Sequence, residues 1–217
     1  LSGICEGRDG EVYFLELGDT GTDTGKIYKL VRTGEVVADP PKFLSQTGAF
    51  TNLSTLTPRA GLLPFDVNSP LWSDGSHKQR WVAIPNNGTH NTAAERVTYR
   101  ETGSWDFPVG TVLVKHFALP VDERNPSITK PLETRFFVHG SNGVYYGVTY
   151  KWNEAGTDAE LMTSGGSGEM RITRNDGSTR TQRWDFPSRA DCRTCHTTAA
   201  DNVLGLRSHQ LAKDFTY

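Results

Sequence analysis

Apolar and polar residues alternate in short runs from residue 80 onward, and this pattern predicts β-strands. Turn signals such as Ser141-Asn142-Gly143 and Asn175-Asp176-Gly177 separate pairs of runs, as in β-hairpins. The predicted strands are residues 81–85, 96–100, 111–119, 132–139, 144–152, 170–174 and 179–184. Helix is expected to be scarce before Asp191. The pattern therefore predicts a mainly β fold whose antiparallel sheets form a sandwich or a partly closed barrel.

The first 38 residues carry a separate and shorter pattern. Residues 11–17 and 26–32 are rich in branched and aromatic residues and predict one hairpin, which alone is marginally stable in water. Cys5 is expected to be a small buried residue. The prolines in Ala38-Asp39-Pro40-Pro41 exclude regular ladders and mark a boundary. We therefore expect residues 1–38 to be the last strands of a preceding domain or a linker, and residues 39–217 to form a β-rich domain.

Charge and hydropathy exclude two classes of partner. The chain has 23 lysines and arginines against 25 aspartates and glutamates, a formal net charge of −2. It therefore lacks the basic surface that nucleic-acid binding requires. No apolar run approaches the length of a membrane span, so we expect no membrane span.

The strongest chemical signal is Cys192-Arg193-Thr194-Cys195-His196. Two thiols three positions apart, followed at once by a histidine, form the spacing at which haem is attached covalently. Each thiol can add across one haem vinyl group, and the histidine then binds the iron as its proximal ligand. Haem c is therefore the predicted cofactor, held by a short, partly helical C-terminal segment. A zinc staple in a β-sandwich binding module and an unmodified thiol pair are the alternatives.

The second axial ligand of such a haem does not follow from the motif. Only 21 residues follow His196 and none is methionine, so the chain is not a standard all-α cytochrome c. His116 is the first candidate, because strand alternation places it among small apolar residues, where an unpaired imidazole is costly. A hydrogen-bonded core histidine explains the same pattern. The other candidates, besides an open position, are His139, His209, Met162 and Met170.

Two arginines near the motif are candidates for haem binding, whereas two of the histidines are not candidates for iron ligation. Arg189 and Arg193 could pair with the haem propionates. His77 and His90 lie in polar, turn-like surroundings and are expected to be solvated. No catalytic residue is predicted.

Two sets of residues resemble known families. Residues 10–15 and 25–30 resemble the closing strands of the propeller in sorbosone/glucose dehydrogenases that use pyrroloquinoline quinone. From Lys42 onward the signatures resemble a family of exported bacterial proteins that carry a CxxCH region, often fused after such a propeller. These signatures are residues 43–50, 67–75, 107–115, 132–135, 151–154 and 192–196.

The resemblance implies an electron-transfer module. The electron donor would be a quinoprotein sugar dehydrogenase domain in the same natural chain, with pyrroloquinoline quinone only in that neighbouring domain. The acceptor would be a redox protein such as a cytochrome or a polysaccharide-active copper oxygenase. Because haem joins CxxCH outside the bacterial cytoplasm and Leu1-Ser2-Gly3-Ile4 is no signal peptide, we expect an excerpt of a longer periplasmic or extracellular protein. An open-site haem enzyme or a gas or peroxide sensor is the alternative.

Overall fold

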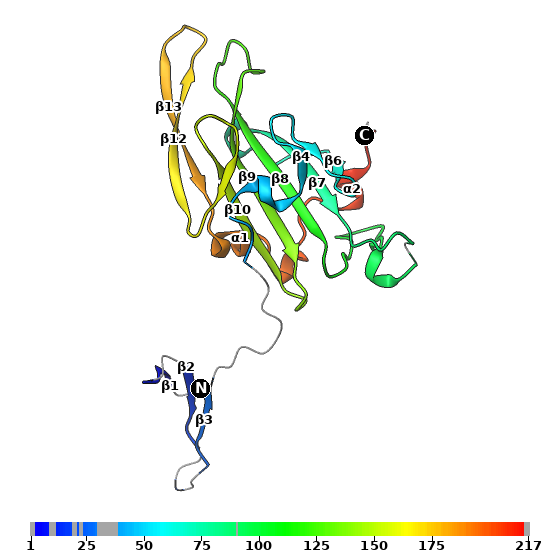
Figure 1. Cartoon of the computed structure of the whole chain (residues 1–217), viewed down its shortest axis with the longest axis vertical. Coiled ribbons are helices and arrows are strands. Elements are labelled where there is room, and N and C mark those ends of the chain that lie inside the picture. The colour runs from blue at the N-terminus through cyan, green and yellow to red at the C-terminus, as the bar shows by residue number, and fades with distance from the viewer. Residues whose placement is uncertain are drawn as a thin grey trace. The chain divides into compact units, whose positions relative to one another are not determined.

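The chain divides into two compact units, Leu1–Ala38 and Asp39–Tyr217. The structure is a computed structural model, and it describes residues 3–8, 12–18, 21, 24–29, 39–89 and 91–214 (Figure 1). The first unit is a three-stranded antiparallel sheet in the order β1-β2-β3. Its strands are β1 (Gly3–Glu6), β2 (Val12–Glu16) and β3 (Lys26–Lys29). Cys5 is exposed on β1, so the expectation that it is buried is wrong.

The second unit is built on a six-stranded antiparallel sheet in the order β11-β10-β9-β8-β7-β6. Its strands are β6 (Leu63–Phe65), β7 (His77–Ala83), β8 (Val112–Pro120), β9 (Thr129–His139), β10 (Tyr145–Trp152) and β11 (Ala159–Leu161). A separate hairpin joins β12 (Gly166–Thr173) to β13 (Thr179–Phe186). The mainly β, antiparallel prediction is confirmed, and the sheets form a sandwich-like fold rather than a closed barrel.

One predicted strand is wrong. Residues 96–100 form no ladder, and Thr98 makes only an isolated bridge with Asp106. This segment follows the short 3₁₀ turn η3 (Ala93–Glu95), which Thr92 and Glu95 close with a capping box. Residues 96–100 therefore belong to a loop that this bridge holds to the domain, although their composition is typical of a strand.

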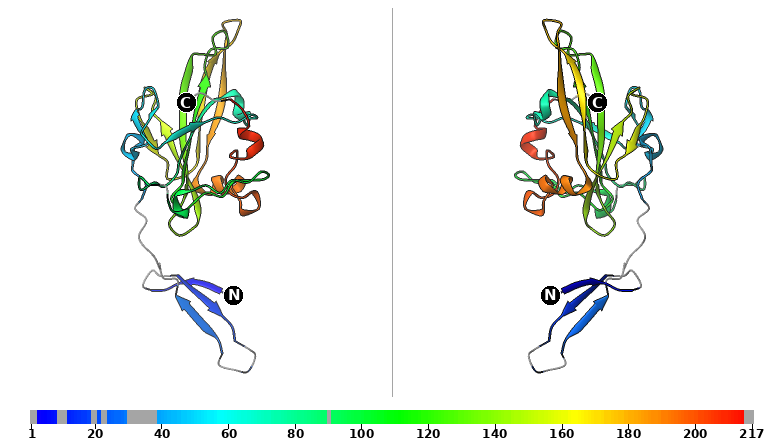
Figure 2. Two further views of the ribbon diagram at one scale, coloured as in Figure 1. Left: turned by 90° about the vertical axis from the view of Figure 1, so that its right-hand side faces the viewer. Right: turned by 90° about the vertical axis from the view of Figure 1, so that its left-hand side faces the viewer.

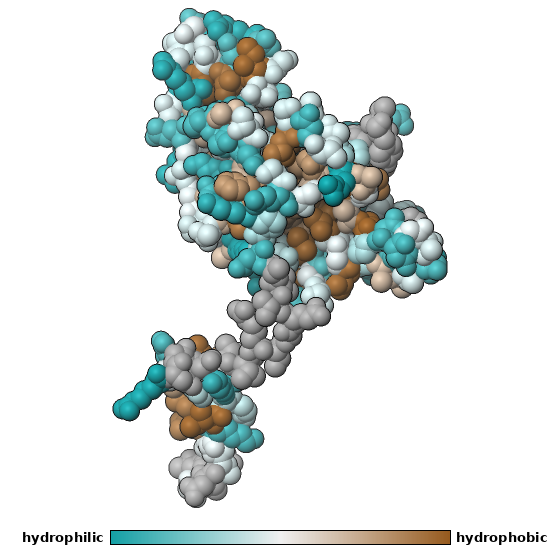
Figure 3. All heavy atoms as spheres, in the orientation of Figure 1, coloured by the Kyte–Doolittle hydropathy of each residue, from teal (hydrophilic) through white to brown (hydrophobic). Residues whose placement is uncertain are grey.

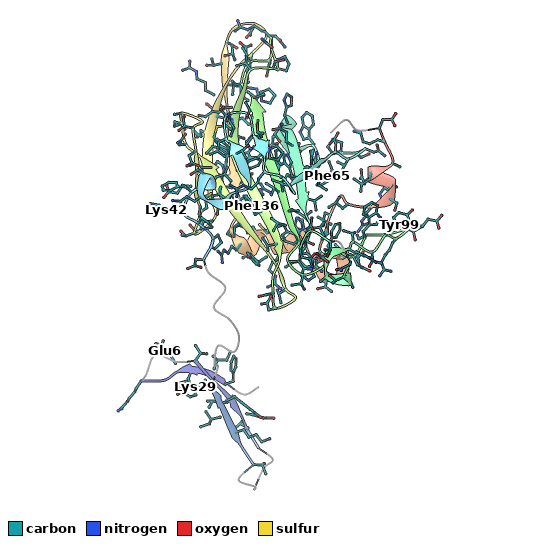
Figure 4. The ribbon with its side chains drawn as sticks, turned by 45° about the vertical axis from the view of Figure 1, so that its right-hand side comes forward. Glu6, Lys29, Lys42, Phe65, Tyr99 and Phe136 are labelled. Atoms are coloured by element: carbon teal, nitrogen blue, oxygen red, sulfur yellow. The ribbon has the colours of Figure 1, made fainter. Side chains whose placement is uncertain are left out.

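The register of the three central strands gives the sheet two different faces. Leu113 on β8, Phe137 on β9 and Gly147 on β10 are cross-strand neighbours and share what we call the site face. Because successive side chains of a strand point to opposite faces, Val114, Phe136 and Val148 share the other, which we call the core face. Figure 4 labels Phe136 in this sheet and Phe65 on the edge strand β6.

The core face is covered by the segment that precedes the sheet. This segment contains η1 (Leu44–Thr47), β4 (Phe50–Asn52) and β5 (Thr57–Pro58). Leu44 and Phe50 are buried in one cluster with Trp81, Val114 and Tyr150. A fully buried side chain of this size contributes roughly 1.5–3 kcal/mol, so this cluster is a main source of stability.

The site face is covered by the later part of the chain. At one end, hairpin β12–β13 buries Trp184 and Phe186 against Phe117 and Leu132. At the other end lie α1 (Arg189–Cys195), η4 (Thr198–Ala200) and α2 (Ser208–Leu211). Figure 2 shows the early blue-cyan segment and the late orange-red helices on opposite sides of the green-yellow sheet.

The helices are short and the surface is mixed. In the described part of the chain no helix has the length and apolar character needed to cross a membrane. The remaining 3₁₀ turn, η2 (Ser73–Gly75), precedes β7. The face of the domain seen in Figure 3 combines hydrophilic side chains with small separate hydrophobic patches.

Candidate functional site

The CxxCH motif lies on α1 and at its end. Ser188 caps the helix, since its Oγ accepts from the Asp191 amide (3.2 Å) while the Asp191 carboxylate accepts from the Ser188 amide (2.8 Å). The His196 amide donates to the Cys192 carbonyl (3.1 Å) and ends the helix. Because residues four apart lie on the same side of a helix, Cys192 and His196 both project from one side of α1.

That side of α1 rests on the site face at Gly147. A Cβ atom at position 147 would lie 2.6 Å from Cys192 Sγ and 2.8 Å from Cys192 Cβ, so only glycine permits this approach. Cys192 is half-buried and Cys195 is exposed, and neither forms a disulfide. Burial raises the pKa of the Cys192 thiol. Two free thiols are thus held three positions apart.

His196 is held in one orientation by its own chain. Its Nδ1 lies 2.6 Å from the Asn202 carbonyl oxygen. Because a carbonyl oxygen only accepts, Nδ1 carries the proton and Nε2 keeps the lone pair that binds a metal. Asp201 and Asn202 both have left-handed φ angles (56° and 57°), which turn the chain back toward the ring. Burial, together with nearby Lys115 and Arg135, lowers the pKa of His196 and favours its neutral form.

A row of rings lies beside His196 on the site face. The imidazole of His196 packs on Phe137, with ring centroids 4.2 Å apart. Phe137 stacks on Tyr145 (5.3 Å), and Tyr145 stacks on His139 (4.1 Å). The two histidines therefore lie at the two ends of one continuous aromatic row.

A cleft of about 790 Å³ opens along this row. His139 and His196 both line it, together with Trp105, Phe107, Tyr145 and Arg193. Its volume lies in the range of ligand pockets, and its lining mixes aromatic rings with polar side chains such as Asp106, Thr198 and Asp201. A ligand in this cleft can contact both histidines.

His116, the first candidate for the distal ligand, does not lie in this cleft. Its register partner is Thr134, and it shares the core face with Val114, so the sheet separates it from His196. His116 Nδ1 lies 2.9 Å from Thr134 Oγ1, and the ring packs edge-on against Trp152. Burial lowers its pKa to about 4. These contacts favour the alternative, in which His116 is a hydrogen-bonded core histidine rather than an iron ligand.

The remaining candidates lie elsewhere. Met170 is buried among the residues that hold hairpin β12–β13 on the sheet, and Met162 packs against that cluster. His209 is exposed on α2 and His77 is exposed on β7. His90 lies outside the described residues. Of the two flanking arginines, Arg193 lines the cleft, whereas Arg189 is exposed at the first position of α1 and is not among the lining residues.

A group of charged residues on the site face had no counterpart in the sequence-based prediction. Glu133 is fully buried and accepts from Arg135 and from Trp184 Nε1 (3.0 Å). Lys115 lies near them, and its burial, followed by the proximity of Arg80 and other cations, lowers its pKa to about 7. The signal that could have found it is the alternation in residues 111–119, which places Lys115 on the face opposite to that of His116.

Two further observations bear on the kind of site. Within residues 3–8, 12–18, 21, 24–29, 39–89 and 91–214, no three side chains of the types that ligate metals converge on one point, as a closed zinc site requires. Comparison with models of known families, with curated proteins and with solved structures finds no match to this chain.

Proposed function

We propose that residues 39–217 bind one c-type haem through Cys192, Cys195 and His196 and transfer single electrons. The observation that carries this proposal is the state of His196. It follows the second thiol directly, its Nδ1 is bound to a carbonyl, and the residue lines the cleft. A metal-binding imidazole is typically oriented in this way by a partner at its other nitrogen.

The donor set fits a haem better than it fits a bare metal ion. A porphyrin supplies four ligands to its iron, so the protein needs to supply only one or two. A site with one anchored histidine therefore suffices, whereas a structural zinc ion needs four protein ligands. Both thiols are free, as addition to vinyl groups requires.

The residues of the chain have distinct roles in this proposal. Cys192 and Cys195 form the thioether bonds, and His196 binds the iron through Nε2. Arg193, which lines the cleft, pairs with a propionate. Haem, when bound, supplies a one-electron redox centre. Tyr145 lines the cleft, and Phe137 packs behind it and against His196.

The proposed partners rest on the resemblance of the sequence. The donor is a quinoprotein sugar dehydrogenase domain in the same natural chain, which alone would hold pyrroloquinoline quinone. The acceptor is a redox protein, such as a cytochrome or a copper oxygenase that acts on polysaccharide. The location is periplasmic or extracellular, where haem is joined to CxxCH.

The test is covalent haem in protein produced together with a bacterial haem-attachment system. We expect a reduced-minus-oxidised spectrum with sharp c-type bands that survive denaturation. Cys192→Ser with Cys195→Ser should lose these bands. Cys5→Ser is the matched control, because Cys5 is an exposed cysteine on β1 of the first unit, and this variant should keep them.

Two results would contradict the proposal. One is the absence of covalent haem from folded wild-type protein made under these conditions. The other is metal analysis that finds zinc without iron, which would favour the zinc-stapled module instead.

A further inference from the structure

We propose that the second unit has a further binding pocket, on the core face of the sheet, which takes a small neutral molecule with an acceptor oxygen for His116 Nε2. This pocket is separate from the CxxCH motif, because His116 lies on the core face and His196 packs on the site face. The inference therefore does not rest on the proposed function.

The pocket has a volume of about 390 Å³, which lies in the range of ligand pockets. One wall is the turn between β4 and β5, through Leu53 and Leu56, and another is the sheet, through His116 and Trp152. None of the described residues that line it is charged. An ionic ligand would therefore find no opposite charge there, and its burial would be costly.

Leu56 forms its part of the wall with an unusual backbone. Its φ angle is 50°, in the left-handed region that residues other than glycine rarely adopt, and yet the side chain is buried with Leu44 and Trp152. Such conformations persist where the surrounding contacts enforce them, and they cluster at ligand-binding sites. The core thus holds this wall of the pocket in place.

The hydrogen bonds of Thr134 determine which nitrogen of His116 carries the proton. Thr134 is fully buried, and its Oγ1 lies 3.0 Å from Trp152 Nε1 and 2.9 Å from His116 Nδ1. Because an indole nitrogen only donates, Oγ1 accepts from Trp152 and has its own proton left for His116 Nδ1. Burial keeps the pKa of His116 near 4, so the ring is neutral at pH 7. With Nδ1 as the acceptor, Nε2 carries the only ring proton.

Nε2 of His116 remains accessible although the residue is 4% exposed. In the described part of the chain, the side-chain nitrogen and oxygen atoms that are both buried and unpartnered are Ser104 Oγ, Glu133 Oε2 and Arg135 Nε. His116 Nε2 also lacks a partner there but is not one of these atoms, so it is not fully enclosed. Since His116 lines the pocket, a ligand in the pocket can reach this donor.

The chemistry of the ligand follows from these groups. An N–H group only donates, so the ligand must bring a carbonyl, ether or hydroxyl oxygen. Leu53, Leu56 and Trp152 offer apolar contacts for a compact hydrocarbon part. The uncharged lining favours a neutral molecule over a carboxylate or an amine.

The first experiment reads the tautomer by nuclear magnetic resonance in the full chain with ¹⁵N-labelled histidine. We expect a proton on Nε2 of His116 and, as an internal reference, on Nδ1 of His139, which lies 3.0 Å from the Phe107 carbonyl oxygen. His116→Phe assigns the His116 signals. A proton on Nδ1 of His116 would overturn the inference.

The second experiment titrates wild-type protein with cyclohexanone and with methylenecyclohexane, which has the same shape but no acceptor oxygen. Cyclohexanone should shift the Nε2 signal of His116 and bind roughly fivefold or more tightly than methylenecyclohexane. Cyclohexanecarboxylate should bind more weakly than the ketone. Equal binding of the two neutral probes, tighter binding of the carboxylate, no binding of any probe, or binding without a shift at His116 would each overturn the inference.

Two variants separate the donor from the space. His116→Phe keeps the ring volume but removes the donor, and it should lower the affinity for cyclohexanone to that for methylenecyclohexane. Ala118→Leu keeps His116 and fills part of the pocket, and it should weaken both probes. His77→Phe, at an exposed histidine on β7, is the matched control and should bind both as wild type does. The comparison of probes in wild-type protein decides the inference even if a variant fails to fold.

Discussion

Gly147 is the residue on which the approach of α1 to the sheet depends. In Gly147→Ala the new methyl group would overlap Cys192, and Cys192 lies on a helix that cannot yield without moving the motif. Overpacking of this kind costs about 1–3 kcal/mol. We expect a loss of stability of this order in denaturant unfolding, together with less covalent haem per protein.

The matched control for this prediction is Gly166→Ala on β12. There the nearest atom to an added Cβ is the flexible end of Met162, at 3.4 Å. This variant should attach haem as the wild type does. Equal effects of the two substitutions would show that α1 does not depend on the close contact at Gly147.

Lys115 should make stability depend on pH in the apoprotein. Its pKa is about 7 in the folded chain against an ordinary 10.5, so between these values the unfolded chain holds a proton that the folded chain has lost. The free energy of unfolding contributed by Lys115 therefore rises with pH across this window, and the penalty is largest below it. The groups that set this pKa are Lys78, Arg80 and Arg135, which lower it, and Glu133, which raises it.

The measurement is urea unfolding of wild type and Lys115→Met at about pH 6 and about pH 9. Lys115→Met should be stabilised most at the lower pH and should show a smaller rise with pH. Lys42→Met, at an exposed lysine in a surface ion pair, should match the wild-type profile. A rise of equal size in Lys115→Met would refute the assignment.

For single residues, the sequence predicted the surroundings of a side chain better than its function. Alternation correctly placed His116 on an apolar face, and the CxxCH spacing singled out His196. The sequence could not show that His139 and His196 share a cleft, because that depends on which layer covers which face of the sheet. The carbonyl partners of both rings are likewise set by turns that no side-chain pattern records.

Among the elements, hairpin β12–β13 is tied to the sheet by a polar contact inside an apolar cluster. Trp184 Nε1 donates to Glu133, whose other carboxylate oxygen has no partner within the described residues. Trp184→Phe would keep the aromatic packing but leave a buried carboxylate with one donor fewer. Such a loss costs about 1–3 kcal/mol.

We expect this loss in denaturant unfolding of Trp184→Phe. Trp72→Phe is the control, because Trp72 is 75% exposed, and it should change stability by no more than about 0.5 kcal/mol. If the two variants have the same stability, the buried contact does not hold the hairpin.

Most strands of the second unit could be predicted, because their apolar residues alternate over long runs. The strands predicted at 111–119, 132–139 and 144–152 correspond to β8, β9 and β10 within a few residues. The hairpin predicted at residues 170–184 is longer in the structure. Residues 166–168 also pair in its ladder, although they have no apolar side chains that could have predicted this. Residues 96–100 mislead because tertiary contacts can override β propensity.

For the whole molecule, composition and pattern gave the fold class but not the layering. The Asp39–Tyr217 unit places its early residues on the core face and its late residues on the site face. Contacts between segments so distant in sequence leave no periodic signal in either one. The candidate site is therefore visible in the sequence only as the motif from Cys192 to His196.

The two faces of the sheet have a consequence for how the chain can change in length. In β9, Phe136 belongs to the core face, whereas its neighbour Phe137 lies on the site face and packs on His196, so alternate residues of one strand belong to different faces. Inserting or deleting one residue within β8, β9 or β10 would move the side chains that follow in that strand to the opposite face of the sheet.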